Sequence, residues 1–171
     1  MKLEYDFFIR DVLEVAPELI GKYLFLKKDN VDHLYMITEV EAYRGEEDLA
    51  CHASKGRTSR TEIMYTRGGH IYVYLIYGMY WMFNIVTGKE DDPQAVLIRG
   101  IEGIKGPGKL TKYLGLDGSY YGEDICNSSR IEIRDNNIFH PITITQRIGI
   151  EYAGEPWASN LWRYVIRNDP K

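Results

Sequence analysis

The sequence is poor in the features that mark secreted, membrane-bound and disulfide-rich proteins. Its 171 residues contain only two cysteines, Cys51 and Cys126, which form no C-x-x-C pair and are too few for a disulfide framework. No apolar run approaches the roughly 20 residues that a membrane-spanning helix needs. Residues 1–15 carry acids where a signal peptide would be basic and then apolar. We therefore expect a cytoplasmic protein with no membrane contact.

Several signatures of catalysis are missing as well. The chain has no nucleophile elbow, no P-loop and no G-x-G-x-x-G fingerprint. Its four histidines show no ligand spacing with cysteines or acids, so we expect no metal site. No lysine stands out within an apolar strand, as an amine nucleophile would. These absences argue against metal-dependent, nucleotide-binding and covalent mechanisms of the common types.

Positive charge is also scarce, because 21 lysines and arginines face 25 acids and give a net charge of −4. The basic residues are unevenly spread, however. Residues 52–70 hold Lys55, Arg57, Arg60 and Arg67 against the single acid Glu62, and residues 97–113 hold Arg99, Lys105, Lys109 and Lys112 against Glu102. A face with this asymmetry could attract DNA despite the negative total. Charge alone favours a scatter of solvated side chains.

Periodicity predicts one mixed α+β domain over residues 1–171, built around an antiparallel sheet, with no repeats or linkers. We expect helices at 11–20 and 109–114, and strands at 22–28, 33–43, 95–100, 131–134, 142–147 and 161–166. The tyrosine-rich segment 68–86 is expected to form two strands with a break at Gly78. Residues 44–70 are predicted to be a long loop that could include one short helix, and a loop of that length is usually functional or disordered.

The strand at 33–43 is the first element with chemical content. Alternation places Glu39, Glu41 and Tyr43 on one face, and assigns the opposite face (Leu34, Met36, Thr38, Val40 and Ala42) to the core. An acid beside an aromatic ring at a strand end could activate water next to a stacked ring. The alternative is the solvated face of an edge strand, and the pattern alone favours it.

The segment that follows suggests a ligand-binding turn. Tyr72 and Tyr74 share one face of a strand, whereas Tyr77 falls on the other face just before Gly78, where the chain is expected to turn. An aromatic hairpin tip has the shape of a wedge that fills the gap left by an extruded base. Fourteen tyrosines also suit half-buried strands, which is the simpler explanation for much of this region.

Three further polar residues are candidates for a functional site: two lie within apolar strands, and one lies in the long loop. Asn84 lies within MFNIV and needs hydrogen-bond partners, from either backbone or ligand. Arg99 lies within AVLIRGI and must be paired, for example with Glu41, in a role that is structural, catalytic or both. His52 follows an acidic run and is close enough in sequence to Glu41 for both to reach one site, although a lone loop histidine is more often at the surface.

At these residues the sequence strongly resembles the alkyladenine (3-methyladenine) DNA glycosylases, the methylpurine glycosylase family. The matching segments are ITEVEAYRGEEDLACHASKGRTSR, MYTRGGHIYVYLIYGMYWMFNI, AVLIRGIE, GPGKL and QRIGIEYAGEPW. They run in family order and cover most of the chain from about residue 21. The resemblance implies a curved antiparallel sheet with flanking helices and a protruding hairpin that inserts into DNA.

The resemblance also implies residue roles. Glu41 matches the acid that activates the attacking water, and Arg99 the arginine that helps to hold this water. The base pocket would consist of Tyr43, His52 and Tyr74, which sandwich the flipped base, and of Asn84, which penalises the exocyclic amino group of undamaged guanine. Tyr77 matches the tyrosine inserted into the duplex. Met64, Arg60 and Lys109 are candidates for contacts with the DNA backbone.

The implied function is that of a monofunctional DNA glycosylase in base excision repair. Its partner would be double-stranded DNA with an alkylated or deaminated purine, such as 3-methyladenine, 7-methylguanine, hypoxanthine or ethenoadenine. Hydrolysis would leave an abasic site, with no metal or organic cofactor and no strand cleavage. We expect a monomer that works on the nucleoid of a bacterial cytoplasm.

Two other functions remain open at this point. A catalytically silent nucleic-acid-binding module on the same scaffold would bind duplexes regardless of lesion and release no base. A nucleoside hydrolase would cleave free nucleosides and ignore the duplex. The presence of Glu41 and Arg99 argues against the first, and the wedge tyrosine with the basic stretches argues against the second.

Overall fold

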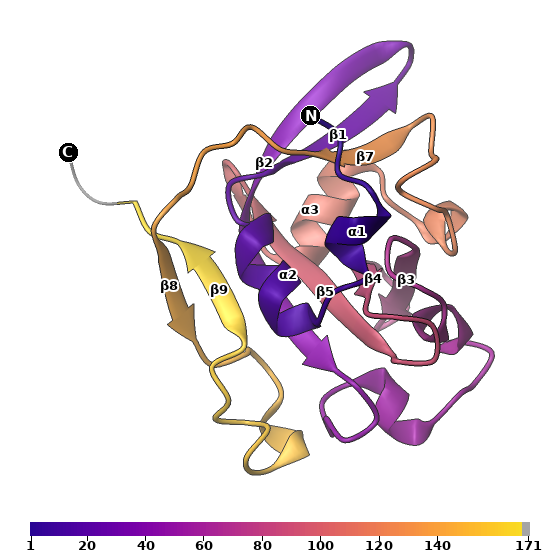
Figure 1. Ribbon diagram of the computed structural model, residues 1–171, viewed down its shortest axis with the longest axis vertical. Coiled ribbons are helices and arrows are strands. Elements are labelled where there is room, and N and C mark those ends of the chain that lie inside the picture. The colour runs from indigo at the N-terminus through magenta and orange to yellow at the C-terminus, as the bar shows by residue number, and fades with distance from the viewer. Residues whose placement is uncertain (169–171) are drawn as a thin grey trace.

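The computed structural model describes residues 1–168, and its dominant layer is an antiparallel sheet of nine strands. The main path runs β3-β4-β5-β2-β1-β7, while β6 pairs with β5 and the β8–β9 pair joins β2 through β9 (Figure 1). The strands are β1 (Tyr23–Lys28), β2 (Val31–Arg44), β3 (Ile71–Ile76), β4 (Tyr80–Thr87), β5 (Gln94–Ile101), β6 (Ile104–Lys105), β7 (Ile131–Arg134), β8 (Ile142–Thr145) and β9 (Arg163–Ile166). The expected α+β domain around an antiparallel sheet is confirmed.

Three α-helices and four 3₁₀ helices occur in the described part of the chain: α1 (Tyr5–Phe8), α2 (Val12–Leu19), α3 (Pro107–Leu114), η1 (His52–Lys55), η2 (Glu62–Tyr65), η3 (Gly118–Tyr120) and η4 (Glu151–Ala153). Both predicted α-helices are present. Asp11 caps α2, because its side chain accepts a hydrogen bond from the Leu13 amide. Pro107 begins α3 and Gly115 ends it in the left-handed conformation. Helix α1 was not predicted.

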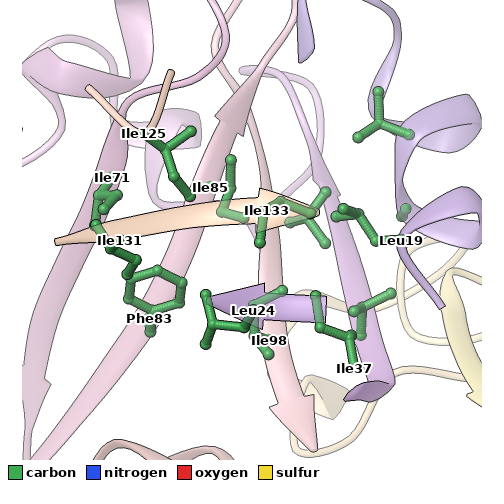
Figure 2. Packing of buried hydrophobic residues seen from close by; sticks show 14 of the residues in the cluster. Leu19, Leu24, Ile37, Ile71, Phe83, Ile85, Ile98, Ile125, Ile131 and Ile133 are labelled. Atoms are coloured by element: carbon green, nitrogen blue, oxygen red, sulfur yellow. The ribbon is translucent and has the colours of Figure 1, made fainter. Parts of the chain in front are cut away.

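The main hydrophobic core is enclosed by the sheet together with helices α2 and α3, and it takes side chains from both ends of the sheet, from β3 and β4 to β1 and β7 (Figure 2). Leu19 of α2 packs with sheet residues such as Leu24, Ile37 and Ile98, all 0% exposed. Burying a side chain of this size contributes about 1.5–3 kcal/mol. This core makes the sheet a rigid platform, and the side chains discussed below project from its strands.

Strand β2 changes partner halfway along, and this overturns part of the predicted alternation. Its residues 31–36 pair with β1, and its residues 39–41 pair with β9. A β-bulge lies between Ile37 and Val40 in the pairing with β5. The bulge shifts the core-facing positions from odd to even numbers. Leu34 is therefore 52% exposed and Met36 and Thr38 only half-buried, whereas Val40 and Ala42 face the core as predicted.

Residues 45–70 form the expected long connection, but it is more structured than predicted. It contains two short helices, η1 and η2, rather than one. Ala53 and Met64 are buried within it and pack against the sheet in a second hydrophobic cluster. The connection therefore covers one end of the sheet, beside the end of β2.

Strands β3 and β4 form a hairpin that turns where the sequence predicts. Tyr77 and Gly78 have φ angles of 51° and 64°, and the Met79 amide donates to the Ile76 carbonyl at 3.1 Å. Two positive φ angles in succession are typical of the type I′ turn, whose twist matches that of hairpin strands. The tip is apolar and open to solvent, because Tyr77 is 88% and Met79 64% exposed.

The expected strands near the C-terminus are shorter than predicted, because β8 ends at Thr145 and β9 begins at Arg163.

Within the described part of the chain, no helix has both the length and the apolar character that crossing a membrane requires.

Candidate active site

Glu41 is a carboxylate buried in the middle of the molecule. It lies on β2 beyond the bulge, and its side chain is 0% exposed. Its Oε1 accepts a hydrogen bond from the Tyr43 hydroxyl at 2.9 Å and lies 3.4 Å from Nη1 of Arg99. Its Oε2 accepts from the Ile148 backbone amide at 2.6 Å. Each oxygen is thus held, and the carboxylate has a fixed orientation.

Arg99 joins Glu41 to a second acid, as its position within an apolar strand predicts. Its Nε donates to Oε1 of Glu39 at 3.2 Å, in addition to the contact with Glu41. Arg163 of β9 donates to the same Glu39 oxygen at 2.7 Å. Two arginines therefore face two carboxylates, which leaves the cluster close to neutral. The pairing of Arg99 with Glu41 that the sequence suggests is confirmed.

Burial raises the pKa of Glu41 above its ordinary value, although Arg99, the Ile148 amide, Tyr43 and Arg147 each act to lower it. The balance favours a more basic carboxylate than one in water. The pKa of Tyr43 is also raised well above its usual range, by burial and by the neighbouring Glu41 charge. Tyr43 therefore stays protonated and donates its hydrogen bond to the carboxylate.

A small cavity of about 60 Å³ opens beside Tyr43. Its wall is largely aromatic and consists of Tyr43, Ala50, Cys51, His52, Met64, Tyr72, Tyr74, Asn84, Ala95 and Tyr152. The His52 ring lies 4.4 Å from that of Tyr74 between centroids, and Tyr72 lies 5.3 Å from Tyr74. All four residues predicted for a base pocket (Tyr43, His52, Tyr74 and Asn84) line this one cavity.

His52 is a neutral member of the wall. Burial lowers its pKa to about 4, with the charges of Arg60 and Lys55 acting in the same direction. Its Nδ1 shares a hydrogen bond of 2.7 Å with the Tyr72 hydroxyl. A neutral imidazole does not repel a cation that enters the cavity.

Asn84 and Met64 lie deeper in the same wall. Asn84 is 3% exposed and donates from Nδ2 to the Tyr72 carbonyl at 3.2 Å, which answers the need for a partner raised by its apolar surroundings. Met64 is 1% exposed, so the expectation that it contacts the DNA backbone is wrong. The 3₁₀ turn of η2 directs its side chain inward, against the cavity.

The other predicted DNA-binding residues are at the surface. Arg60 is exposed, and its guanidinium lies 5.0 Å from the centroid of the Tyr74 ring at the edge of the cavity wall. Lys109 is exposed on the first turn of α3. Tyr77 lies at the hairpin tip, three residues beyond Tyr74 on the same chain segment.

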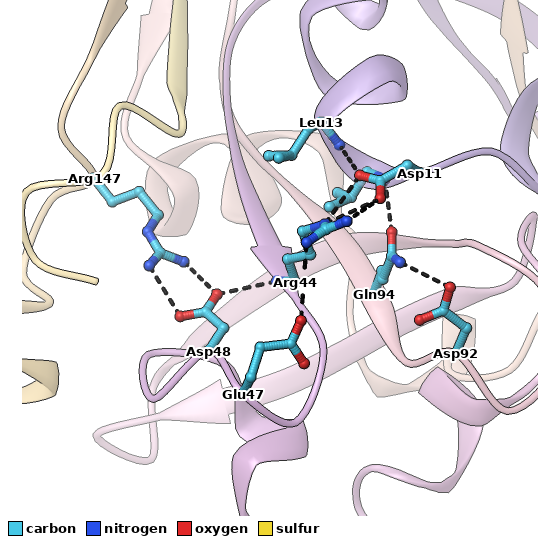
Figure 3. A network of polar contacts seen from close by, with 9 residues as sticks. Asp11, Leu13, Arg44, Glu47, Asp48, Asp92, Gln94 and Arg147 are labelled. Carbon is cyan, nitrogen blue, oxygen red and sulfur yellow. Dashed lines mark hydrogen bonds and ion pairs between the residues drawn. The ribbon is translucent and has the colours of Figure 1, made fainter. Parts of the chain in front are cut away.

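Sequence reasoning missed a second buried ion pair. Asp48 and Arg147 both have side chains that are 0% exposed, and they meet through two hydrogen bonds, of 2.7 and 3.0 Å (Figure 3). Asp48 belongs to an acidic run that reads as a solvated loop, and Arg147 ends a segment predicted as a strand. Nothing in the sequence around Arg147 predicts that this side chain is buried, or that the amide of the next residue, Ile148, bonds Glu41. Tyr152, at the mouth of the cavity, was missed as well.

Among residues 1–168, histidine, cysteine, aspartate and glutamate side chains form no group of three that could hold a metal ion. Both cysteines are free and buried, and burial raises the pKa of Cys51 to about 12. The site therefore offers a fixed carboxylate, paired arginines and aromatic surfaces as its chemical groups.

Comparison with known proteins places this arrangement in a family. The family model for methylpurine-DNA glycosylase (MPG) matches residues 6–105 and 102–170. Bacterial relatives that carry the name "Putative 3-methyladenine DNA glycosylase" include one from Natranaerobius thermophilus, 40% identical over 99% of this chain and 98% of its own length. Others are from Legionella pneumophila, 44% identical over 99% and 96%, and from Rickettsia felis, 44% identical over 96% and 92% of the two chains.

Proposed function

The chain belongs to the methylpurine-DNA glycosylase family, whose members act in DNA repair on alkylation damage, and from this premise we propose how its pocket releases a damaged purine. The proposed reaction is hydrolysis of the N-glycosidic bond of an alkylated or deaminated purine in duplex DNA. The observation that carries the proposal is the Glu41 carboxylate, 0% exposed and held in one orientation beside an aromatic cavity.

The aromatic wall supports binding of an extruded base. In the proposed complex the purine stacks between Tyr43 on one side and His52 with Tyr74 on the other. A base alkylated at N3 or N7 is cationic, and aromatic faces attract cations. Neutral His52 adds no repulsion. Asn84 would press against the exocyclic amino group of an undamaged guanine and disfavour its entry.

The Glu41 carboxylate supports a hydrolytic step. It would take a proton from a water molecule as the water oxygen bonds to C1′ of the sugar. The C1′–N bond breaks, and its electron pair leaves with the base. A base alkylated at N3 or N7 leaves as a neutral molecule, whereas a neutral lesion such as hypoxanthine has to be protonated as it leaves. The carboxylate also stabilises the positive charge that develops on the sugar, and Arg99 orients both carboxylate and water. Water as the nucleophile leaves an abasic site with both strands intact and needs no cofactor.

Extrusion would be assisted by the exposed hairpin tip. Tyr77 is placed to fill the gap that the purine leaves in the stack, and damaged bases cost less to flip than intact ones. We expect the cavity wall to adjust as a purine enters. Tyr152 is the wall residue most free to move, since it is 74% exposed and its one hydrogen bond, to the Ala50 carbonyl, is 3.4 Å long.

The proposal extends to the setting of the reaction. Arg60 and Lys109 would contact DNA phosphates, and the partner is double-stranded DNA with a damaged purine. We expect the protein to act as a monomer on the nucleoid in a bacterial cytoplasm.

Glu41→Gln tests the proposal directly. Single-turnover base release is measured on duplexes that each carry one 7-methylguanine or one hypoxanthine. Loss of the general base is expected to slow release by about 10²–10⁴-fold. Affinity for the lesion duplex should stay close to that of the wild type, because the amide keeps the size of the carboxyl group.

Glu62→Gln is the matched control, because Glu62 is an exposed acid of η2 outside the cavity wall. It should release base at the wild-type rate. Normal release by Glu41→Gln would remove Glu41 from its proposed role. Tight duplex binding by the wild type without release of any base would indicate the silent binding module instead, and cleavage of free nucleosides would indicate the nucleoside hydrolase.

A further inference from the structure

Arg147 is a buried cation at the meeting point of three segments of the active site. Its two terminal nitrogens bond Asp48 at 2.7 and 3.0 Å. They also donate to the backbone carbonyls of Ala42, at 3.0 Å, and Trp157, at 3.3 Å. Its Nε has no partner among the described residues. One guanidinium therefore ties the end of β2 to the loop before η1 and to the loop after η4.

Asp48 extends this connection through the loop that carries the cavity wall. Besides Arg147 it accepts hydrogen bonds from the backbone amides of Arg44, at 3.0 Å, and Ala50, at 3.1 Å. Its own carbonyl accepts from the Cys51 amide at 2.8 Å. Ala50, Cys51 and His52 all line the cavity, so Asp48 fixes the backbone from which this part of the wall is built.

The neighbours of Arg147 are groups that the proposed reaction uses. The next residue, Ile148, donates its amide to Oε2 of Glu41 at 2.6 Å. The Arg147 guanidinium carbon lies 4.9 Å from the centroid of the Tyr43 ring. Any shift of Arg147 would move an amide that holds the carboxylate and a cation that supports the ring stacked on the base.

We propose that Arg147 and Asp48 form a positioning pair, which holds the Ile148 amide on Glu41 and the Tyr43 ring beside it. The pair touches no reacting atom and acts through these two groups. The inference rests on the proposed role of Glu41 as the general base.

The energetics of burial favour a positioning role over a purely stabilising one. Taking both charges out of water costs about as much as their attraction returns, so such pairs contribute little to stability compared with apolar side chains of similar volume. Four hydrogen bonds from the Arg147 guanidinium, and three more from backbone amides to Asp48, do, however, define a single arrangement of the loops. A general base is effective only within hydrogen-bond reach of its water, so this arrangement matters for rate.

Arg147→Met tests the proposal, with single-turnover release measured from pH 5 to pH 9. The carboxylate of Glu41 is faced by Arg99 of β5, by Tyr43 of its own strand, by Tyr74 of β3, and by Arg147 and Tyr152 of the C-terminal loops. Removal of the Arg147 charge and loosening of the Ile148 amide both favour the protonated acid. Release should therefore fall at least about tenfold, and its acidic limb should move to higher pH. Arg147→Lys keeps the charge and should restore part of both.

The double variant Glu41→Gln/Arg147→Met separates positioning from a general loss of structure. If Arg147 acts partly through Glu41, Arg147→Met should slow release by a smaller factor in the Glu41→Gln background than in the wild type, because the two effects are then not additive. Additive losses would overturn the proposal. Asp48→Asn provides a second route if Arg147→Met does not fold, because it keeps the Arg147 charge and weakens the bonds that fix its position. Release by Asp48→Asn should be slower than release by the wild type, and an unchanged rate would overturn the proposal.

Arg130→Met is the matched control. Arg130 also pairs with an acid through two nitrogens, Nε at 2.9 Å and Nη2 at 2.6 Å from Oε2 of Glu123, and lies 3.8 Å from the centroid of the Tyr120 ring, away from the cavity. It should leave the rate and pH profile unchanged. A wild-type profile in a folded Arg147→Met variant would refute the positioning pair alone. If the wild type itself released no base from any lesion duplex, the proposed function would be refuted instead.

Discussion

The end of β2 and the tip of the β3–β4 hairpin belong to one sheet but have opposite surroundings. At the first, Glu41 is 0% exposed, and both of its oxygens are held by donors from separate segments. At the second, Tyr77 is 88% exposed, in a turn whose backbone has positive φ angles. Among the described residues, the Tyr77 side chain makes no hydrogen bond and no ring contact.

The difference in burial between Glu41 and Tyr77 matches the two functions proposed for them, a chemical step and insertion into DNA. A reaction step needs groups that are already in place, because reorganising them during the reaction raises its barrier. Insertion into a duplex needs an apolar surface that stays free until DNA binds. Exposing this surface destabilises the folded protein only slightly if it is confined to a short turn. The first region should thus be sensitive to changes in charge, and the second to changes in shape.

Of the substitutions that compare the two regions, Arg99→Met is expected to have the largest effect on base release, because it removes a charge from the buried region. Glu41 would lose the contact at 3.4 Å, and its pKa would rise further because burial would no longer be opposed by this cation. We expect single-turnover release to fall about 100-fold and its acidic limb to move to higher pH. Rate profiles from pH 5 to pH 9 provide the measurement.

Arg163→Met makes this comparison specific. Arg163 and Arg99 both contact Oε1 of Glu39, at 2.7 and 3.2 Å, but only Arg99 also reaches Glu41. The Arg163 variant should lose less activity and keep the wild-type pH limb. Equal losses in the two variants would mean that Glu39, and not Glu41, is the acid that Arg99 serves.

The two regions also differ in how far the sequence predicts them. Tyr77-Gly78 could be identified as a turn because a residue that tolerates positive φ follows an alternating strand, and both signals are local. The pairing of Arg99 with Glu41 follows from the cost of an unpaired charge in an apolar strand. The bulge at Ile37–Val40 could not be predicted, because it arises where β2 changes partner from β1 to β9. Leu34 and Met36 were therefore assigned to the wrong face.

Long-range pairs account for the remaining gaps. Asp48 and Arg147 are 99 residues apart. Asp48 belongs to an acidic run and Arg147 ends a predicted strand, and neither position carries a local signal of burial. The identity of the base-pocket residues came from the resemblance to a family, since their spacing alone fits an aromatic core equally well. The structure brings Tyr43, His52, Tyr74 and Asn84 to one cavity, but their roles toward a base stay predictions.

A smaller effect is expected from Tyr77→Ala, which shortens the side chain at the exposed tip. Loss of the ring should weaken capture of an extruded base by about tenfold, since nothing then fills the gap in the stack. The free energy of unfolding should change by less than about 0.5 kcal/mol, because an exposed side chain without contacts is removed. Binding of lesion duplexes and urea denaturation provide the two measurements.

Tyr113→Ala is the control for Tyr77, because Tyr113 is 61% exposed on α3 and its ring faces Tyr35 of β2. It should leave lesion capture unchanged. Equal affinity and equal release for Tyr77→Ala and the wild type would show that the tip is not a wedge. A loss of stability in Tyr77→Ala would show that the tip is packed in solution.

The smallest effect concerns His52, whose charge state should not influence base release near neutral pH. Its pKa is lowered from 6.5 to about 4 by burial, so the folded protein keeps it neutral while the unfolded chain takes up a proton below pH 6.5. A group of this kind contributes stability that is present above pH 6.5 and lost as the pH falls toward 4. On acidification from pH 7 to pH 5, the wild type should therefore lose more unfolding free energy than His52→Gln, by at most about 1.4 kcal/mol per pH unit.

His33→Gln, on the β1–β2 hairpin, is the control for urea denaturation at each pH. Parallel pH dependences for the wild type and His52→Gln would mean that His52 takes up its proton over the same pH range in the folded protein as in the unfolded chain. A cationic lesion would then meet a cationic wall at acidic pH.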